Sequence, residues 1–136
     1  MKIVYSDPKT GRSAQMELQQ DRAVMFINKK IGEIIDGTAI GLTGYKLKIT
    51  GGSDKSGFPL NQSVDGPKKT TLLERGSKSG KGSGEYRRMT VRGNTVSADT
   101  EQINVTIVEY GEKPIDEILP KKEKAEKKEE KAQEKA

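Results

Sequence analysis

Cysteine, histidine and tryptophan are absent from this chain of 136 residues. Without cysteine it forms no disulfide and offers no thiolate ligand, and without histidine it lacks the commonest general acid or base and all imidazole metal ligands. Carboxylates, lysines, tyrosines and serines remain, but no pattern places a nucleophile beside a base. We therefore expect no catalytic activity, no cofactor and no metal site.

Long apolar runs are also absent. No segment approaches the ~20 residues that a membrane-spanning helix needs, and the opening MKIVYSDP is too short and too polar for a signal peptide. We expect a cytoplasmic protein. Hydrophobic residues, 31% of the chain, suffice for one modest core and thin out after Leu119. One domain is expected over residues 1–111, followed by a charged extension over 112–136.

Positive charge is concentrated in one segment. Residues 66–93 hold eight Lys or Arg and two Asp or Glu, although the whole chain has a formal net charge of only +5. Such a cluster favours a polyanion partner, because each cation that neutralises a phosphate releases condensed counterions. A basic loop that only keeps the protein soluble is the alternative. The cations are Lys68, Lys69, Arg75, Lys78, Lys81, Arg87, Arg88 and Arg92, and Tyr86 offers a stacking surface beside them.

Short alternating segments indicate an all-β fold of about seven strands. Apolar and polar residues alternate most clearly at 103–107, and turn-forming residues separate the segments. This pattern is typical of a small β-barrel or sandwich, and we expect a β-barrel-like body. Residues 28–43 form either a short helical turn or an irregular strand and hairpin. The expected strands are 2–6, 12–18, 22–28, 45–50, 70–75, 86–92 and 102–110.

The most informative segment, residues 46–60, reads KLKITGGSDKSGFPL. It joins an alternating strand to a turn rich in glycine, which lacks the Cβ that would keep a phosphate backbone away from main-chain N–H groups. A purely structural tight turn is the alternative reading. The expected turn residues are Gly51, Gly52, Asp54, Gly57 and Pro59.

Five side chains of this segment have expected roles. Asp54 is expected to cap the turn through its carboxylate, since a lone carboxylate lacks the several oxygen ligands that a hard cation requires. Phe58 is expected in the core rather than as a stacking platform. The lysines Lys46, Lys48 and Lys55 are expected to neutralise phosphates.

Residues 76–84, GSKSGKGSG, resemble a phosphate-binding loop only superficially. Three residues rather than four separate Gly76 from Gly80, and Gly82 follows Lys81 where a Ser or Thr must bind magnesium. We expect either a hairpin tip that orders on RNA through Lys78 and Lys81, or a plain mobile loop.

Residues 121–136 favour a helix, because they include no Gly, Pro or β-branched residue. At about 100° per residue, lysines fall on one side of that helix and glutamates on the other. The like charges at i,i+4 weaken the isolated helix. Either the lysine side lies along RNA phosphates, or the tail is solvated and disordered.

Several motifs follow one another in a specific order: KIV at 2–4, DPKTG at 7–11, KIG at 30–32, GY at 44–45, ITGGSDKSGFP at 49–59, GEYRR at 84–88, VRG at 91–93 and GEK at 111–113. This combination closely resembles the eukaryotic-type ribosomal protein S6 family of the small subunit, in the short form expected of archaea. Leu60 stands where the family motif usually has methionine, a change that conserves volume. Residues 112–136 contain no Ser or Thr, so the phosphorylation of eukaryotic members does not carry over.

The resemblance implies a non-catalytic constituent of the small ribosomal subunit, with a β-barrel-like body bound to ribosomal RNA and neighbouring ribosomal proteins, and a helical C-terminal extension. It implies neither a membrane nor a small-molecule substrate. We expect the predicted cations to contact RNA mainly through its phosphates and shape. The alternative is a free-standing regulatory or interaction module whose basic loop binds an acidic partner. An enzyme using Lys, Asp or Tyr would need a deep pocket with converging ionisable groups.

Overall fold

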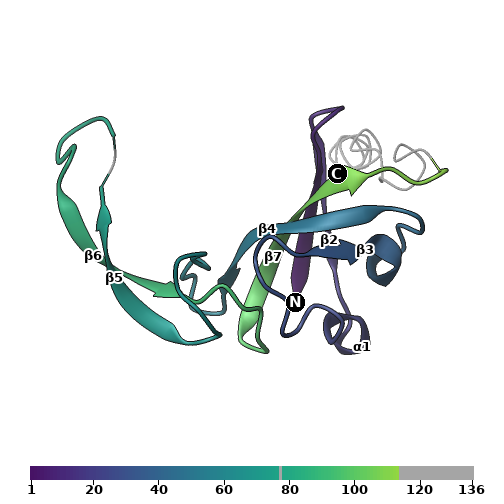
Figure 1. Ribbon diagram of the computed structural model, residues 1–136, viewed down its shortest axis with the longest axis horizontal. Helices are drawn as coiled ribbons and strands as arrows, with labels where there is room; N and C mark the ends of the chain where they lie inside the picture. Colours follow the sequence, from purple (N-terminus) through teal and green to yellow (C-terminus); the bar gives the residue numbers. More distant parts are fainter. Residues whose placement is uncertain (77, 114–136) are drawn as a thin grey trace, which may run out of the picture.

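The computed structural model describes residues 1–76 and 78–113. They form a five-stranded sheet that carries the core and a two-stranded ribbon that extends away from it (Figure 1). This confirms the prediction of an all-β protein. The elements are β1 (Lys2–Asp7), β2 (Arg12–Glu17), α1 (Gln20–Ala23), β3 (Ile34–Asp36), the 3₁₀ helix η1 (Gly37–Ile40), β4 (Lys46–Asp54), β5 (Lys69–Arg75), β6 (Tyr86–Arg92) and β7 (Thr100–Glu109). Among the described residues, no helix is long and apolar enough to cross a membrane.

The large sheet is open, with the strand order β2-β1-β7-β4-β3. Strands β1 and β7 run parallel, and the other neighbours are antiparallel. A closed barrel would require β2 and β3 to pair, but they form the two edges of the sheet, and β3 has only three residues. The expected barrel-like closure is therefore wrong for the described part of the chain.

Alternation along the central strands produces the core. In residues 46–50 of β4 and 103–107 of β7 every second residue is buried, including Leu47, Ile49, Ile103 and Val105, none of which is more than 1% exposed. Since burying one such side chain fully contributes about 1.5–3 kcal/mol, these strands supply much of the stability. Other fully buried core side chains come from β1, from the segments around α1 and η1, and from the connection between β6 and β7: Ile3, Phe26, Ile40, Leu42 and Val96.

The segment 22–28 was expected to be a strand, but residues 22–23 end α1 and residues 24–28 form turns. Residues after α1 continue in tight turns, with Phe26 N donating to Ala23 O at 3.0 Å and Ile27 N donating to Val24 O at 3.3 Å. Ala23 and Phe26 are buried, whereas Val24 and Met25 are more than 60% exposed. Burial at a spacing of three residues is the helical pattern, not the strand pattern. Of residues 28–43, which the sequence leaves open, 34–36 form β3 and 37–40 form η1.

Gly51 and Gly52 lie inside β4 and not in a turn, which corrects the sequence-based expectation. The register against β7 shifts between Ile49 and Gly51, as in a β-bulge. An added Cβ on Gly52 would lie 2.3 Å from the carbonyl oxygen of Gln102. The close approach of β7, and not a left-handed backbone, therefore requires glycine at 52. The true turn follows β4, where Gly57 has a φ of 86°.

Candidate nucleic-acid interface

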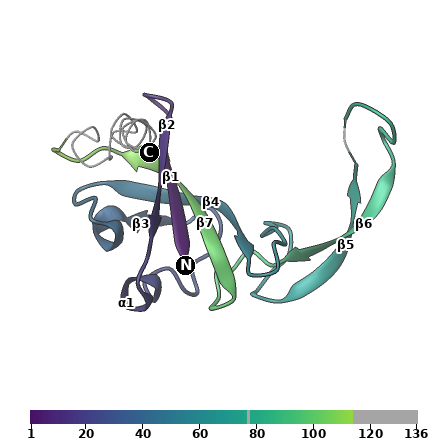
Figure 2. The same cartoon turned by 180° about the vertical axis from the view of Figure 1, so that it is seen from behind.

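Strands β5 and β6 form an arm, which we define as residues 68–92. They pair with each other from Lys69 opposite Arg92 to Arg75 opposite Tyr86. In the described part of the chain, neither strand joins the five-stranded sheet, and both views show the ribbon leading away from the body (Figures 1 and 2). An isolated two-stranded hairpin is at best marginally stable in water. The arm therefore depends on its attachment to the body and presents most of its surface to solvent.

A buried ion pair attaches the arm. At the end of β6, Arg92 Nε lies 3.0 Å from the Oδ2 of Asp54, and the two side chains are only 15% and 1% exposed. The Arg92 guanidinium also donates to the carbonyl oxygen of Pro67 at 3.2 Å and lies 3.4 Å from the carboxylate of Asp99. Its charge is thus already balanced inside the protein. We assign Arg92 to the base of the arm, and its contact with RNA stays a prediction.

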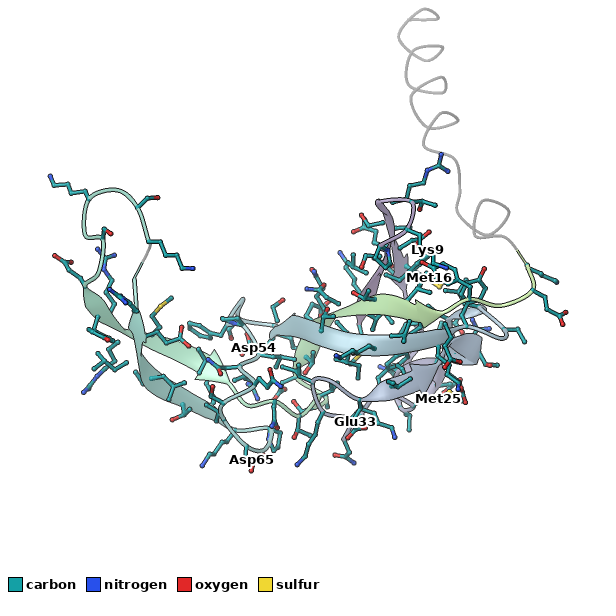
Figure 3. All side chains as sticks on the ribbon, turned by 45° about the horizontal axis from the view of Figure 1, so that its top comes forward. Lys9, Met16, Met25, Glu33, Asp54 and Asp65 are labelled. Atoms are coloured by element: carbon teal, nitrogen blue, oxygen red, sulfur yellow. The ribbon has the colours of Figure 1, made fainter. Side chains whose placement is uncertain are left out.

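The carboxylate of Asp54 holds the turn as well as the arginine. Its Oδ1 accepts hydrogen bonds from the backbone N–H groups of Ser56 at 2.9 Å and Phe58 at 2.8 Å. Burial by itself raises the pKa of Asp54, but the hydrogen bonds from Arg92, Phe58 and Ser56 outweigh burial and lower the pKa below its ordinary value. Figure 3 places Asp54 where the arm meets the body. The ionised side chain therefore fixes both the turn and the arm.

Backbone hydrogen bonds also attach the arm to the body, and we call this whole set of contacts at the base of the arm the joint. The N–H of Asn61 donates to Arg92 O at 2.8 Å, Arg92 N–H donates to Pro59 O at 2.9 Å, and Gly93 N–H donates to Lys68 O at 2.9 Å. An added Cβ on Gly93 would lie only 1.7 Å from the carbonyl oxygen of Gly66. Sequence reasoning missed the structural role of Asn61 and Gly93, because the chain segments that meet here are distant in sequence. The VRG motif at 91–93 is the one local signal of the joint.

The sequence motifs that carry the family resemblance lie in the body, in the arm and in the contacts that connect the two. The family model for ribosomal protein S6e matches residues 1–120. The chain belongs to the ribosomal protein S6e family. It is 51% identical over 121 residues to the small ribosomal subunit protein eS6 of Methanocaldococcus jannaschii, covering 87% of this chain and 89% of that protein. It is 46% identical to the eS6 of Methanocella arvoryzae, covering 92% and 89%, and 48% identical to that of Methanothermobacter thermautotrophicus, covering 87% and 94%.

Membership of the S6e family confirms the resemblance found in the sequence motifs and agrees with the expectation that the chain is not an enzyme. The described residues contain no group of three or more acidic, histidine or cysteine side chains placed to hold a metal ion. The predictions for the charged extension lie outside the described residues, apart from its first two positions.

The arm of this S6e protein carries most of the predicted RNA contacts. Side chains ending in nitrogen project from its tip into solvent (Figure 3). Lys69 Nζ lies 4.3 Å above the ring of Phe58, a cation–π contact beside the joint. Phe58 is partly buried and serves as this platform, rather than belonging to the main core. The exposed cations of the arm are Lys68, Lys69, Arg75, Lys78, Lys81, Arg87 and Arg88, and Tyr86 is 65% exposed.

The remaining predicted contacts lie on the body of this S6e protein. Lys46 and Lys48 point outward from β4, opposite the buried Leu47. Lys46 Nζ forms an exposed ion pair with Glu109 at 3.1 Å, so part of its charge is balanced. Lys55 is exposed in the turn at the base of the arm. The structure therefore separates the predicted cations into an arm group and a smaller body group.

Proposed function

We propose that the protein is a structural, non-catalytic constituent of the small ribosomal subunit in the cytoplasm, where it binds ribosomal RNA and contacts neighbouring ribosomal proteins. The supporting comparison is its similarity to proteins named small ribosomal subunit protein eS6 over most of its length. The arm is the proposed main contact with RNA, and Lys46, Lys48 and Lys55 form a second contact on the body.

One observation carries the proposal of RNA binding: the arm has eight cations and two carboxylates but hardly any core of its own. Of its residues on β5 and β6, Val91 is the one that is fully buried. A thin ribbon of this kind reaches into spaces that a globular body cannot enter. Phosphates are a fitting partner, since neutralising them releases counterions and RNA is recognised largely through backbone and shape.

Salt dependence of RNA binding tests the proposal. A variant in which four cations of the arm are replaced by alanine should bind RNA with a weaker salt dependence. The slope of log K against log salt should decrease in magnitude by about four, one for each phosphate that is no longer neutralised. A second variant removes four cations from the body and matches the charge change. The arm variant changes Arg75, Lys78, Lys81 and Arg88, and the control changes Lys2, Arg22, Lys29 and Lys30.

The assay measures binding of the full-length chain to small-subunit ribosomal RNA across a range of salt concentrations. The proposal expects a strong reduction of slope and affinity in the arm variant and a small one in the control. Equal reductions would show that only net charge matters. An unchanged arm variant that still binds an acidic protein would instead support the alternative, a free-standing interaction module.

A further inference from the structure

The two faces of the arm carry different chemistry. Residues directly opposite each other in an antiparallel pair point to the same side. One side therefore carries Arg75 opposite Tyr86 and Leu73 opposite Arg88. We call these four residues the tyrosine face. The other side carries Glu74 opposite Arg87, with Glu85 two residues before Arg87 on the same side.

Both carboxylates of the arm belong to the side away from the tyrosine face. The Oε1 of Glu74 accepts a hydrogen bond from the side-chain amide of Asn61 at 2.5 Å. Glu85 lies 4.0 Å from the guanidinium of Arg87, so the charge of Arg87 is partly balanced by a neighbour. Within residues 1–76 and 78–113, Arg75 and Arg88 form no ion pair. The unbalanced positive charge of the two strands therefore lies mainly on the tyrosine face.

The same face exposes two large side chains to solvent. Leu73 is 68% exposed and Tyr86 is 65% exposed. Directly opposite side chains are ~5 Å apart at Cβ and diagonal ones ~7–8 Å, so the four residues form one small patch. The arginines occupy one diagonal of this patch, and the tyrosine and leucine occupy the other. An exposed ring between two unpaired guanidinium groups fits a ligand that is both planar and anionic.

We propose that the tyrosine face recognises RNA that carries an unpaired nucleotide beside a helix, with the Tyr86 ring stacked on the unpaired base and Arg75 and Arg88 bound to the flanking phosphates. The inference rests on the proposed RNA-binding function and adds the class of RNA. In a regular A-form helix the bases are stacked inside the helix, and the major groove is too narrow for side chains to read them. Bulges, loops and ends expose base faces for stacking on an aromatic ring.

The test uses two RNA hairpins, one with a single bulged adenosine in its stem and one with the same stem fully paired. Binding of the full-length chain to each is measured at one salt concentration. The wild-type chain is expected to prefer the bulged hairpin. Replacing the bulged base by 2-aminopurine adds a direct readout, because stacking on a ring quenches its fluorescence.

Substitutions at Tyr86 separate stacking from charge. Tyr86→Ala should weaken binding to the bulged hairpin by roughly 5- to 150-fold, the reduction typical of removing one base–aromatic stack, and leave binding to the paired hairpin nearly unchanged. Tyr86→Phe should retain the preference because it keeps the ring, whereas Tyr86→Leu should abolish it. The exposed position makes all three changes compatible with folding, which circular dichroism verifies.

Matched arginine variants test the choice of face. Arg88→Ala should weaken binding to both hairpins several-fold, and Arg87→Ala, which removes the same charge from the opposite face, should have a much smaller effect. Equal affinity of the wild type for the two hairpins, or equal weakening in Tyr86→Ala on both, would overturn the inference while RNA binding itself stands. Failure to bind either hairpin, with binding to small-subunit ribosomal RNA intact, would likewise overturn the inference alone. Failure to bind that ribosomal RNA as well would reject the proposed function.

Discussion

The buried ion pair at the base of the arm leads to a sharp prediction about stability. Asp54→Asn keeps the size of the side chain and leaves an oxygen for the backbone N–H groups of Ser56 and Phe58, but removes the negative charge facing Arg92. Breaking a fully buried pair from one side costs about 3–5 kcal/mol. We expect about 2–3 kcal/mol here, because Arg92 retains the carbonyl of Pro67 and the carboxylate of Asp99.

Urea unfolding followed by far-ultraviolet circular dichroism measures this destabilisation. With an m-value in the usual range, the expected change lowers the unfolding midpoint of Asp54→Asn by about 1 to 2 M urea. The matched control is Asp99→Asn, which removes the same charge from the same arginine at a side chain that is 61% exposed. An exposed pair contributes at most about 1 kcal/mol, so the control should stay close to the wild type. Equal midpoints for the two variants would refute the reasoning.

Three further predictions concern other features of the fold. Gly52→Ala should lower the free energy of unfolding by about 1–3 kcal/mol in urea titrations, because its Cβ would overlap the carbonyl oxygen of Gln102. Gly51→Ala is the control, since its Cβ would meet nothing within 4 Å, and it should change the free energy of unfolding by less than about 1 kcal/mol. Burial raises the pKa of Asp7, but its hydrogen bonds outweigh burial and lower the pKa below 3.8, as at Asp54. Both carboxylates should therefore stabilise the fold above pH ~4, and melting temperatures should fall as pH drops through their folded pKa values, less steeply in Asp54→Asn. Lys46→Ala breaks only an exposed pair and should alter the unfolding midpoint little.

The strands were largely predictable because alternation is a local property. The expected segments 70–75 and 86–92 correspond to β5 (Lys69–Arg75) and β6 (Tyr86–Arg92) within one residue. That these two strands leave the body as an arm was not predictable, since strand partners are decided by contacts far along the chain. The apolar run at 23–27 reads equally well as strand or helix, and its burial at Ala23 and Phe26 decided the outcome.

The sequence predicted which residue types form the candidate site, but not which of its arginines are paired with carboxylates. A count of cations treats Arg87, Arg88 and Arg92 alike, although Arg87 lies near Glu85, two residues before it, and Arg92 pairs with a distant carboxylate. Asp54 lies 38 residues before Arg92, and only the folded turn brings them together. Likewise, Gly51 and Gly52 form a typical turn dipeptide, yet pairing with β7 draws both into β4.

Sedimentation of a native lysate through a sucrose gradient, with the protein followed across fractions at low and high salt, tests the central claim most directly. The account predicts that the protein migrates with the small ribosomal subunit in stoichiometric amount and remains there at moderate salt. Its absence from ribosomal fractions at low salt would contradict the proposed role and direct the search to a soluble acidic partner of the arm.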